Sequence, residues 1–396
     1  MPKTVALRAP AAGAVDPAKS GSRGKILFFV TEDWYFCSHR LPLAVAAKQA
    51  GYEVAVATRV RAHGQAILAA GLRLIPLELS RGGRNPLTEW LTVWRLFRVY
   101  RRERPDLVHH VALKPVLYGS LAARLAGVPR VVNALTGLGH IFAESNRAGL
   151  LRWAVKGAIR KLLGGRRSRV IVQNPDDLRR LSAAAALDPK AVALIRGAGV
   201  DLAQFRPHRE PEGPPVVVLA ARMLWDKGVG EFVAAATQLT QQGIVARFVL
   251  VGDADHENHS AIPTRQLETW KAQGPVDWWG RREDMPAVFA ACHIVCLPSY
   301  YGEGVPKVLL EAAAAGRPIV TTDMPGCREV VRDGDNGFLV PPKNVSALAA
   351  ALARLLENPP LRARMGRRGR EIAEAEFGVE RVIEATLAVY RGLLQS

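Results

Sequence analysis

Cysteine and long apolar runs are both scarce in this 396-residue sequence. The four cysteines (Cys37, Cys292, Cys296 and Cys327) are too few for a disulfide framework in a chain of this length. No apolar run approaches the ~18 residues that a membrane-spanning helix needs. Residues 1–24 are rich in Ala, Pro, Gly and Ser and lack the apolar stretch of a secretory signal, so we expect a disordered tail. From these absences we expect the protein to lie in the cytoplasm.

Metal-ligand clusters and a dinucleotide fingerprint are also missing from the sequence. Cys292 and Cys296 flank His293, but no second pair of ligands has zinc spacing, and we interpret both cysteines as core residues. The segment Thr136–Phe142 contains a G-x-G pattern but ends in phenylalanine where a Rossmann fingerprint needs a third glycine. We therefore predict no bound metal and no nicotinamide or flavin cofactor.

Acidic residues are scarce in the first half of the chain only. Residues 1–205 carry 32 Lys and Arg against 13 Asp and Glu, a net charge of +19, whereas residues 206–396 carry 22 against 23, a net charge of −1. An excess confined to one half indicates that this half meets a polyanionic partner, such as an anionic membrane or a nucleic acid. Because no nucleic-acid-binding module is recognisable, we predict an anionic membrane surface and no nucleic acid.

Short apolar runs alternate with helical segments from Lys25 onward. The runs are apolar on consecutive residues, which is typical of strands buried on both faces of a parallel sheet. The predicted strands are Lys25–Val30, Glu53–Thr58, Leu72–Leu77, Asp106–His110, Arg130–Ala134, Arg169–Val172 and Ala191–Ile195, then Val216–Ala221, Arg247–Gly252, Val276–Trp279, His293–Pro298 and Pro318–Thr321.

A proline-rich segment separates these two series of strands, so the chain is predicted to form two doubly wound α/β domains with a hinge. We expect an N-terminal domain over residues 25–205, a linker over 206–214, a C-terminal domain over 215–380 and a last helix over 381–396. Ligands of such sheets bind at the carboxyl ends of the strands, so two facing domains would enclose one central cleft.

A glycine-rich turn and a helix follow the strand predicted at His293–Pro298. The turn spans Ser299–Val305, and Pro306 suits the first turn of a helix. Free N–H groups and the helix dipole at such a start form an anion site. Glu303 in the turn and Glu311 in the helix are poor phosphate ligands and suit the paired hydroxyls of a sugar or a ribose.

Two cations follow the first strand of the same domain. Arg222 and Lys227 flank a short loop that enters a helix near Gly228. Cations aimed into the cleft would neutralise a diphosphate leaving group as its charge develops. Each cation alone is most simply a solvated surface charge, but their convergence with a helix start and two carboxylates indicates a functional site.

The E-x7-E pattern of Glu303 to Glu311 and the R-x4-K pattern of Arg222 to Lys227 resemble those of the family 4 retaining nucleotide-sugar glycosyltransferases, which have the GT-B fold. Further similar segments are Gly199–Asp201 with Phe205 and Pro207, Val251–Asp253, Gly280-Arg281 and Asp333–Val340, so the resemblance covers residues 25–394. It implies two Rossmann-like domains facing a central cleft, a donor bound by the C-terminal one and a last helix that crosses back to the first.

The resemblance also implies that the donor is a UDP-sugar and which residues bind it. They are Arg222 and Lys227 for the diphosphate, Glu303 for the sugar, Glu311 for the ribose, Arg281 near the base and, through their backbone, Gly252, Gly304, Val305, Pro306 and Lys307.

The first half is similar, within that family, to enzymes that extend sugars linked to undecaprenyl diphosphate. The similar segments are Ser38–Pro42, Ser80-Arg81 with Asn85-Pro86, Pro105–Leu107, Lys114 and Gly137–Gly139. Where the wider family has a glycine loop after its first strand, this chain has Glu32-Asp33-Trp34. The predicted acceptor-binding residues are His39, Arg40, Lys114, Thr136 and Arg196, with Arg40 and Lys114 as candidates for the acceptor diphosphate.

No nucleophile is predicted at a fixed place beside the donor sugar, so retention implies departure and attack on one face within an ion pair. Arg222, Lys227 and the helix start would then perform the task of a metal. His109 and His110 end a predicted strand at the cleft, and His109 is our candidate base for the acceptor hydroxyl, although a lone strand-end histidine is more often structural.

Two amphipathic basic helices are predicted in the first half. The first places Leu87, Trp90, Leu91, Trp94 and Phe97 at three- and four-residue spacing and ends in arginines. The second, over residues 147–169, sets Trp153 beside Arg152, Lys156, Arg160 and Lys161, a pattern typical of a helix lying on an anionic membrane. The alternative for both is a core-packing helix with a solvated basic face.

Together the resemblance and the charge predict a metal-independent retaining glycosyltransferase. It would move N-acetylgalactosamine or a similar hexose from a UDP-sugar to an undecaprenyl-diphosphate-linked sugar, at the inner face of the cytoplasmic membrane. A nucleotide-sugar epimerase or phosphorylase of the same architecture is the second interpretation. A basic membrane- or nucleic-acid-binding protein without catalysis is the third.

Overall fold

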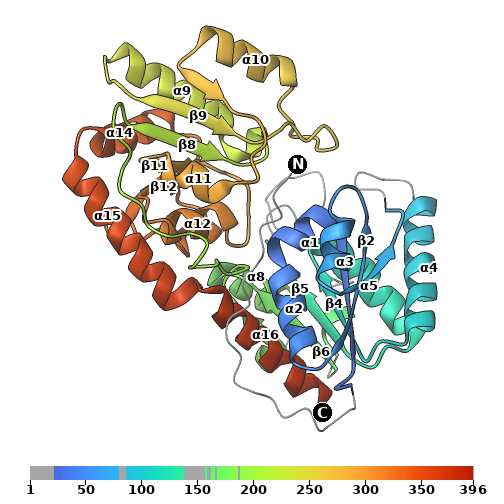
Figure 1. The fold of residues 1–396 in the computed structure, drawn as a ribbon. Coiled ribbons are helices and arrows are strands. Elements are labelled where there is room, and N and C mark those ends of the chain that lie inside the picture. Colours follow the sequence, from blue (N-terminus) through green and yellow to red (C-terminus); the bar gives the residue numbers. More distant parts are fainter. Residues whose placement is uncertain are drawn as a thin grey trace.

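The computed structural model describes residues 22–79, 86–137, 157, 162–165, 167–185 and 188–395. These residues form two lobes, each a parallel sheet with helices packed on its faces, which confirms the predicted pair of doubly wound α/β units (Figure 1). The residues predicted to face the membrane, Arg152, Trp153, Lys156, Arg160 and Lys161, lie outside the described residues.

The first lobe is built on a sheet whose described strands follow the order β3-β2-β1-β4-β5-β6-β7. They are β1 (Lys25–Glu32), β2 (Glu53–Arg59), β3 (Arg73–Pro76), β4 (Leu107–Val111), β5 (Val131–Ala134), β6 (Ser168–Val172) and β7 (Val192–Leu194). Every adjacent pair is parallel. The order reverses between β1 and β4, so the carboxyl ends of these two strands form the crevice where such sheets bind ligands.

The second lobe repeats this plan with the described order β10-β9-β8-β11-β12-β13. Its strands are β8 (Val216–Ala220), β9 (Arg247–Val251), β10 (Val276–Trp278), β11 (Ile294–Leu297), β12 (Ile319–Thr322) and β13 (Gly337–Val340). All pairs are again parallel, and the order reverses between β8 and β11.

Strand β13 was not predicted from the sequence. It has only four residues and begins at a glycine, so it shows neither the length nor the β-branched content of a strand. Gly337 is needed there because a Cβ atom would lie 2.1 Å from the carbonyl oxygen of Ile319 on the neighbouring strand. Tertiary packing, and not local propensity, makes this edge strand.

The helices lie between and after the strands. In the first lobe they are α1 (Asp33–His39), α2 (Leu41–Gln49), α3 (Gly64–Ala69), α4 (Pro86–Glu103), α5 (Leu113–Ala126), α8 (Pro175–Ala185) and the short η1 (Pro189–Ala191). In the second they are η2 (Trp225–Lys227), α9 (Val229–Gln241), α10 (Thr264–Gln273), α11 (Met285–Ala290), α12 (Lys307–Ala314), α13 (Pro325–Arg328), α14 (Val345–Leu356), α15 (Pro359–Ile372), the π-helical η3 (Ala373–Phe377) and α16 (Val379–Leu394).

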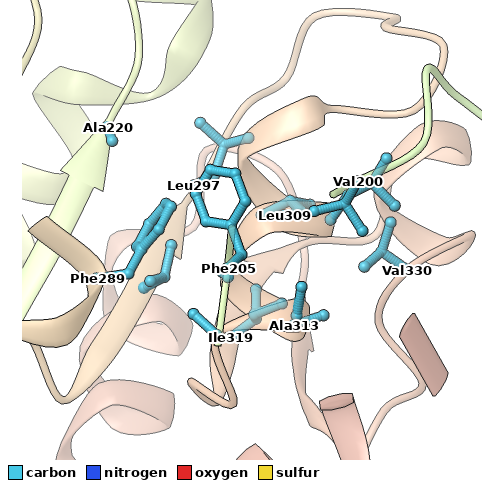
Figure 2. Close-up of a cluster of buried hydrophobic side chains, with 14 of the residues drawn as sticks. Val200, Phe205, Ala220, Phe289, Leu297, Leu309, Ala313, Ile319 and Val330 are labelled. Atoms are coloured by element: carbon cyan, nitrogen blue, oxygen red, sulfur yellow. The ribbon is translucent and has the colours of Figure 1, made fainter. Parts of the chain in front are cut away.

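The segment that joins the lobes is anchored in the second hydrophobic core. Val200 and Phe205 are buried among side chains of the second sheet, and the ring of Phe205 lies 5.9 Å from that of Phe289 (Figure 2). The packing thus assigns these residues to the second core, although the predicted domain boundary placed them in the first domain.

Helix α16 returns to the first lobe, as the family resemblance implies (Figure 1). Val382, Leu387, Tyr390 and Leu393 belong to the core cluster of the first sheet. The chain therefore crosses between the lobes twice.

Candidate active site

A pocket of about 400 Å³ lies between the two lobes. Its floor is formed where both sheets reverse their order, by Val30 and Val111 from the first and by Ala220 and Leu297 from the second. The predicted site residues that line it are His39 and Lys114 from the first lobe and Arg222, Lys227, Glu303, Pro306 and Lys307 from the second. The structure thus gathers residues from distant parts of the chain into one cleft.

The loop after β8 carries both predicted diphosphate ligands. It contains the 3₁₀ turn η2, which ends at Gly228 with a φ of +74°. A Cβ atom on Gly228 would lie 2.1 Å from the carbonyl oxygen of Pro298, so glycine is required for the loop to pack against the end of β11. This approach places Lys227 in an ion pair with Glu303 of the β11 loop.

Arg222 lines the same pocket but is held by a different carboxylate. Its Nη1 atom lies 2.7 Å from Oδ2 of Asp255, in the loop that follows β9. The Arg222 guanidinium also lies 6.0 Å from the ring centre of Trp34, a pocket residue on α1 of the first lobe. Sequence reasoning missed Trp34 and Asp255. The replacement of the family's glycine loop at Glu32–Trp34 was a signal that could have identified the tryptophan.

Glu303 is held from two sides in the turn after β11. Besides its ion pair with Lys227, its Oε1 atom lies 2.9 Å from the hydroxyl of Ser299. Both members of the ion pair line the pocket, so they present a carboxylate and an ammonium group to one ligand. Such a pair can take a hydroxyl and a phosphate oxygen at neighbouring positions.

Glu311 and Lys307 form a second pair, one turn apart on α12. Lys307 Nζ lies 2.8 Å from Oε1 of Glu311. Glu311 is only 7% exposed, whereas Lys307 lines the pocket. Burial raises the pKa of the Glu311 carboxyl, and the charge of Lys307 offsets this only in part.

The turn at residues 302–305 touches the first lobe through its backbone. The N–H of Gly304 donates to the carbonyl of Thr136 at 3.0 Å, and the N–H of Val305 donates to Oε1 of Gln173 at 3.0 Å. These two N–H groups were predicted to face the donor, and in this structure they bond the lobes together. Gln173 was missed because nothing in its sequence surroundings marks it.

His39 and Lys114 line the first lobe's side of the pocket. The His39 ring stacks on Tyr35, with ring centres 4.1 Å apart. Burial, and then the charge of nearby Lys307, lowers the pKa of His39 to about 3, so this imidazole is neutral at physiological pH. Lys114 Nζ lies 2.8 Å from Oε1 of Glu89 on α4.

Arg40 follows His39 but does not line the pocket. Its side chain is almost entirely buried, at 3% exposure, and its Nε atom has no hydrogen-bond partner among the described residues. A buried guanidinium without full pairing costs free energy and is available to an anion.

The predicted place of His109 at the cleft is wrong. Strand β4 continues to Val111, and the His109 side chain is fully buried. Its ring stacks on Phe28 at 5.0 Å, and its Nδ1 atom is hydrogen-bonded to the hydroxyl of Tyr390 on α16. A base must reach the acceptor hydroxyl, so a histidine enclosed under a helix is not suited to that role.

Arg196, which was predicted to bind the acceptor, does not line the pocket. Its guanidinium pairs with Glu329 and Glu376, each at 2.9 Å, and so ties the first lobe to the second. Arg281 does not line the pocket either. Its Nη2 atom lies 3.3 Å from Nε2 of His63 in the first lobe.

Gly252 has a structural role that its sequence motif does not reveal. Its φ is +137°, and a Cβ atom would lie 1.9 Å from the carbonyl oxygen of Ala221. The glycine therefore lets the loops after β8 and β9 approach closely, which places Arg222 beside Asp255.

Within the described ranges, no group of three His, Cys, Asp or Glu side chains is placed to hold a metal ion. Cys292 and Cys296 are buried free thiols of the core, as predicted. Among the helices that the structure describes, none has the length and apolar character needed to cross a membrane.

Comparison with known proteins decides the family. Residues 25–174 match the family of glycosyl transferase 4-like proteins, and residues 201–372 match the glycosyl transferases group 1. The N,N'-diacetylbacillosaminyl-diphospho-undecaprenol alpha-1,3-N-acetylgalactosaminyltransferase of Campylobacter jejuni is 30% identical over 82% of this chain and 87% of its own length. The chain belongs to the group 1 glycosyltransferases of family 4.

Two further similarities describe this glycosyltransferase. The UDP-Gal:alpha-D-GlcNAc-diphosphoundecaprenol alpha-1,3-galactosyltransferase of Escherichia coli is 25% identical over 67% of this chain and 70% of its own. The structure of HepE from Anabaena, in complex with UDP and glucose, matches with a TM-score of 0.76 and 19% identity, covering 93% of this chain and 99% of that one. The glycosyltransferase thus has the GT-B fold and is a retaining enzyme, as predicted, which sets aside the interpretation as a binding protein without catalysis.

Proposed function

We propose that this glycosyltransferase moves N-acetylgalactosamine or a similar hexose from a UDP-sugar to a sugar linked to undecaprenyl diphosphate, at the inner face of the cytoplasmic membrane. The observation that carries the proposal is the presence of cations on both walls of one pocket: Arg222, Lys227 and Lys307 on the second lobe and Lys114 on the first. A donor and an acceptor that each carry a diphosphate need cations on both sides of the reacting sugars.

The relatives support the same substrate classes. The C. jejuni and E. coli enzymes are both named for diphosphoundecaprenol-linked acceptors, and HepE was solved with UDP. We assign the donor to the C-terminal domain, residues 215–380, and the acceptor to residues 25–205.

Donor binding would exchange partners within the ion pairs already present. The diphosphate takes the place of Glu303 beside Lys227, and the freed carboxylate accepts hydrogen bonds from hydroxyls of the donor sugar. The same exchange at Lys307 frees Glu311 for the ribose hydroxyls. Each cation thereby changes from a carboxylate partner to a phosphate partner without becoming unpaired.

Catalysis would rest on stabilising the leaving group. As the bond between the sugar C1 and the phosphate oxygen breaks, its electron pair passes to the departing UDP, whose charge Arg222 and Lys227 neutralise. The acceptor hydroxyl attacks the same face and gives its proton to the departing phosphate oxygen, because His109, the predicted base, is fully buried and does not line the pocket. These cations would do the work that a metal does in other transferases.

The test is a panel of nucleotide sugars incubated with an undecaprenyl-diphosphate-linked sugar, with products identified by mass. We expect one UDP-hexosamine to give a product one sugar longer, in the presence of EDTA, with loss of transfer in Lys227→Ala and Glu311→Ala. Transfer from no donor would overturn the proposal. Turnover of a UDP-sugar without any acceptor would instead indicate an epimerase.

A further inference from the structure

Helix α4 presents an apolar surface that the transfer chemistry does not use. Trp90 is 59% exposed, and Leu91 and Trp94 are each 47% exposed. In the described parts of the chain, no other element presents more than one exposed large hydrophobic side chain. The opposite side of α4 is fixed in the core through Val93 and Leu96, so the exposed side chains cannot rotate inward.

Arginines share this surface of α4. At 100° per residue, the exposed apolar residues and Arg95, Arg98, Arg101 and Arg102 fall within an arc of about 140°. The Arg98 guanidinium lies 4.8 Å from the Trp94 ring centre. One acidic neighbour, Glu78, pairs with Arg95 at 2.9 Å. The acids of α4 itself point elsewhere and are paired with basic residues: Glu89 with Lys114, and Glu103 with Lys25 and Arg73.

The same helix is tied directly to the acceptor side of the pocket. Glu89 precedes Trp90 in sequence, and its carboxylate holds Lys114 at 2.8 Å. Lys114 lines the pocket, whereas Trp90 faces outward. Figure 1 shows α4 at the outer edge of the first lobe, on the side away from the second lobe. One helix therefore connects the pocket cation to the exposed apolar surface.

We infer that the exposed side of α4, defined by Trp90, Leu91, Trp94, Arg98, Arg101 and Arg102, is the surface by which the enzyme lies on a bilayer containing anionic lipid. Tryptophan side chains favour the headgroup level of a membrane, and arginines attract its phosphates. The inference rests on the proposed function, which gives the acceptor a lipid anchor. It adds that α4, when it lies on the bilayer, holds Lys114 close to the membrane depth at which the acceptor's diphosphate lies.

The test compares two triple variants of the full chain. The first is Trp90→Ser, Leu91→Gln and Trp94→Ser on α4. The control removes three exposed apolar side chains elsewhere, as Leu68→Ser, Leu125→Gln and Val245→Ser, which are 48%, 54% and 74% exposed. In sedimentation with phosphatidylglycerol–phosphatidylcholine vesicles, we expect the α4 variant to bind at least about tenfold more weakly and the control to bind like the wild type. Wild-type binding should weaken as salt rises.

Vesicle binding by the α4 variant at the wild-type level would overturn the inference. A change from dimer to monomer in sedimentation velocity, with vesicle binding retained, would also overturn it, because the surface would then be a subunit interface. Transfer to an acceptor with a short, water-soluble prenyl chain separates the inference from the proposed function, and this rate should be equal in both variants. Loss of vesicle binding in a protein that transfers to no lipid-linked acceptor would refute only the proposed function.

Discussion

The cations that line the pocket are paired on both walls, including Lys114 with Glu89 on the first lobe, but the walls differ in their buried polar atoms. On the second lobe, each cation that lines the pocket is paired with an acid of its own lobe: Lys227 with Glu303, Lys307 with Glu311 and Arg222 with Asp255. On the first lobe, buried polar atoms at and behind the pocket lack hydrogen-bond partners among the described residues: His39 Nδ1, Arg40 Nε and His109 Nε2. The wall of the second lobe, which we call the donor wall after the proposed function, is thus complete by itself, and the wall of the first lobe, the proposed acceptor wall, is not.

The ion pairs of the second lobe and the unpartnered groups of the first lobe affect the stability of the fold differently. Partly buried ion pairs contribute little to stability, because the loss of hydration offsets their attraction. On the donor wall, these ion pairs serve ligand binding, because a diphosphate can take the place of each carboxylate. Unpartnered buried groups, by contrast, destabilise the fold by about 1–3 kcal/mol each. A site that keeps such groups is expected to recover that free energy when a polar ligand binds.

The largest effect is expected from Lys227→Ala, which breaks the donor wall at its central pair. We expect kcat/KM to fall about 10²–10³-fold, since one charge-stabilising group at the leaving group is removed. The matched control is Lys271→Ala, an exposed lysine on α10 of the same lobe, which should retain activity. A loss of less than about fivefold at Lys227 would show that the donor wall does not carry the leaving-group charge.

A backbone change should disturb the junction of the two walls. A Cβ atom on Gly326 of α13 would lie 1.6 Å from the carbonyl oxygen of Gly304, so Gly326→Ala must displace the turn that meets Thr136. We expect kcat/KM to fall at least about tenfold with the helical content unchanged. Gly392→Ala is the control, because nothing lies within 4 Å of its added Cβ. That variant should retain activity and gain about 0.5–1 kcal/mol of stability.

Arg40→Met tests whether the incompletely paired guanidinium of Arg40 serves to bind the acceptor. Methionine keeps the length of the side chain and removes a buried guanidinium whose Nε is unpartnered. We expect the free energy of unfolding to rise by about 1–3 kcal/mol and the KM for the lipid-linked acceptor to rise about tenfold, with the donor KM unchanged. Initial rates give the two KM values, and urea denaturation gives the free energy of unfolding. A destabilised variant with an unchanged acceptor KM would show that Arg40 is purely structural.

The sequence was sufficient to predict the fold because strands buried on both faces of a parallel sheet are continuously apolar, as β8 and β11 are. It failed at β13, where pairing with β12 overrides weak local propensity. It also failed at the segment containing Val200 and Phe205, because a linker without periodicity gives no indication of which core will bury its side chains.

The donor wall was predictable because its residues lie on two short motifs after neighbouring strands. The residues that pair with this wall could not be predicted in the same way. Asp255 and Gln173 become site residues only through packing between loops that are distant in sequence. His109 was misplaced for the related reason that α16, more than 250 residues away, covers it with Tyr390. Contacts between distant segments have no local sequence pattern.

The smallest effect is expected from the pH dependence of the stability that His39, a buried side chain at the first-lobe wall, contributes. Burial and the charge of Lys307 lower its pKa from 6.5 to about 3. Between these values the unfolded chain binds more protons than the native one, so stability contributed by neutral His39 is lost as the pH falls below about 6.5. We expect His39→Gln to lose less stability than the wild type between pH 7 and pH 5 in urea denaturation. His208→Gln, at an exposed linker position, should follow the wild-type slope. Parallel slopes for all three proteins would show that burial does not lower the pKa of His39 in the native protein.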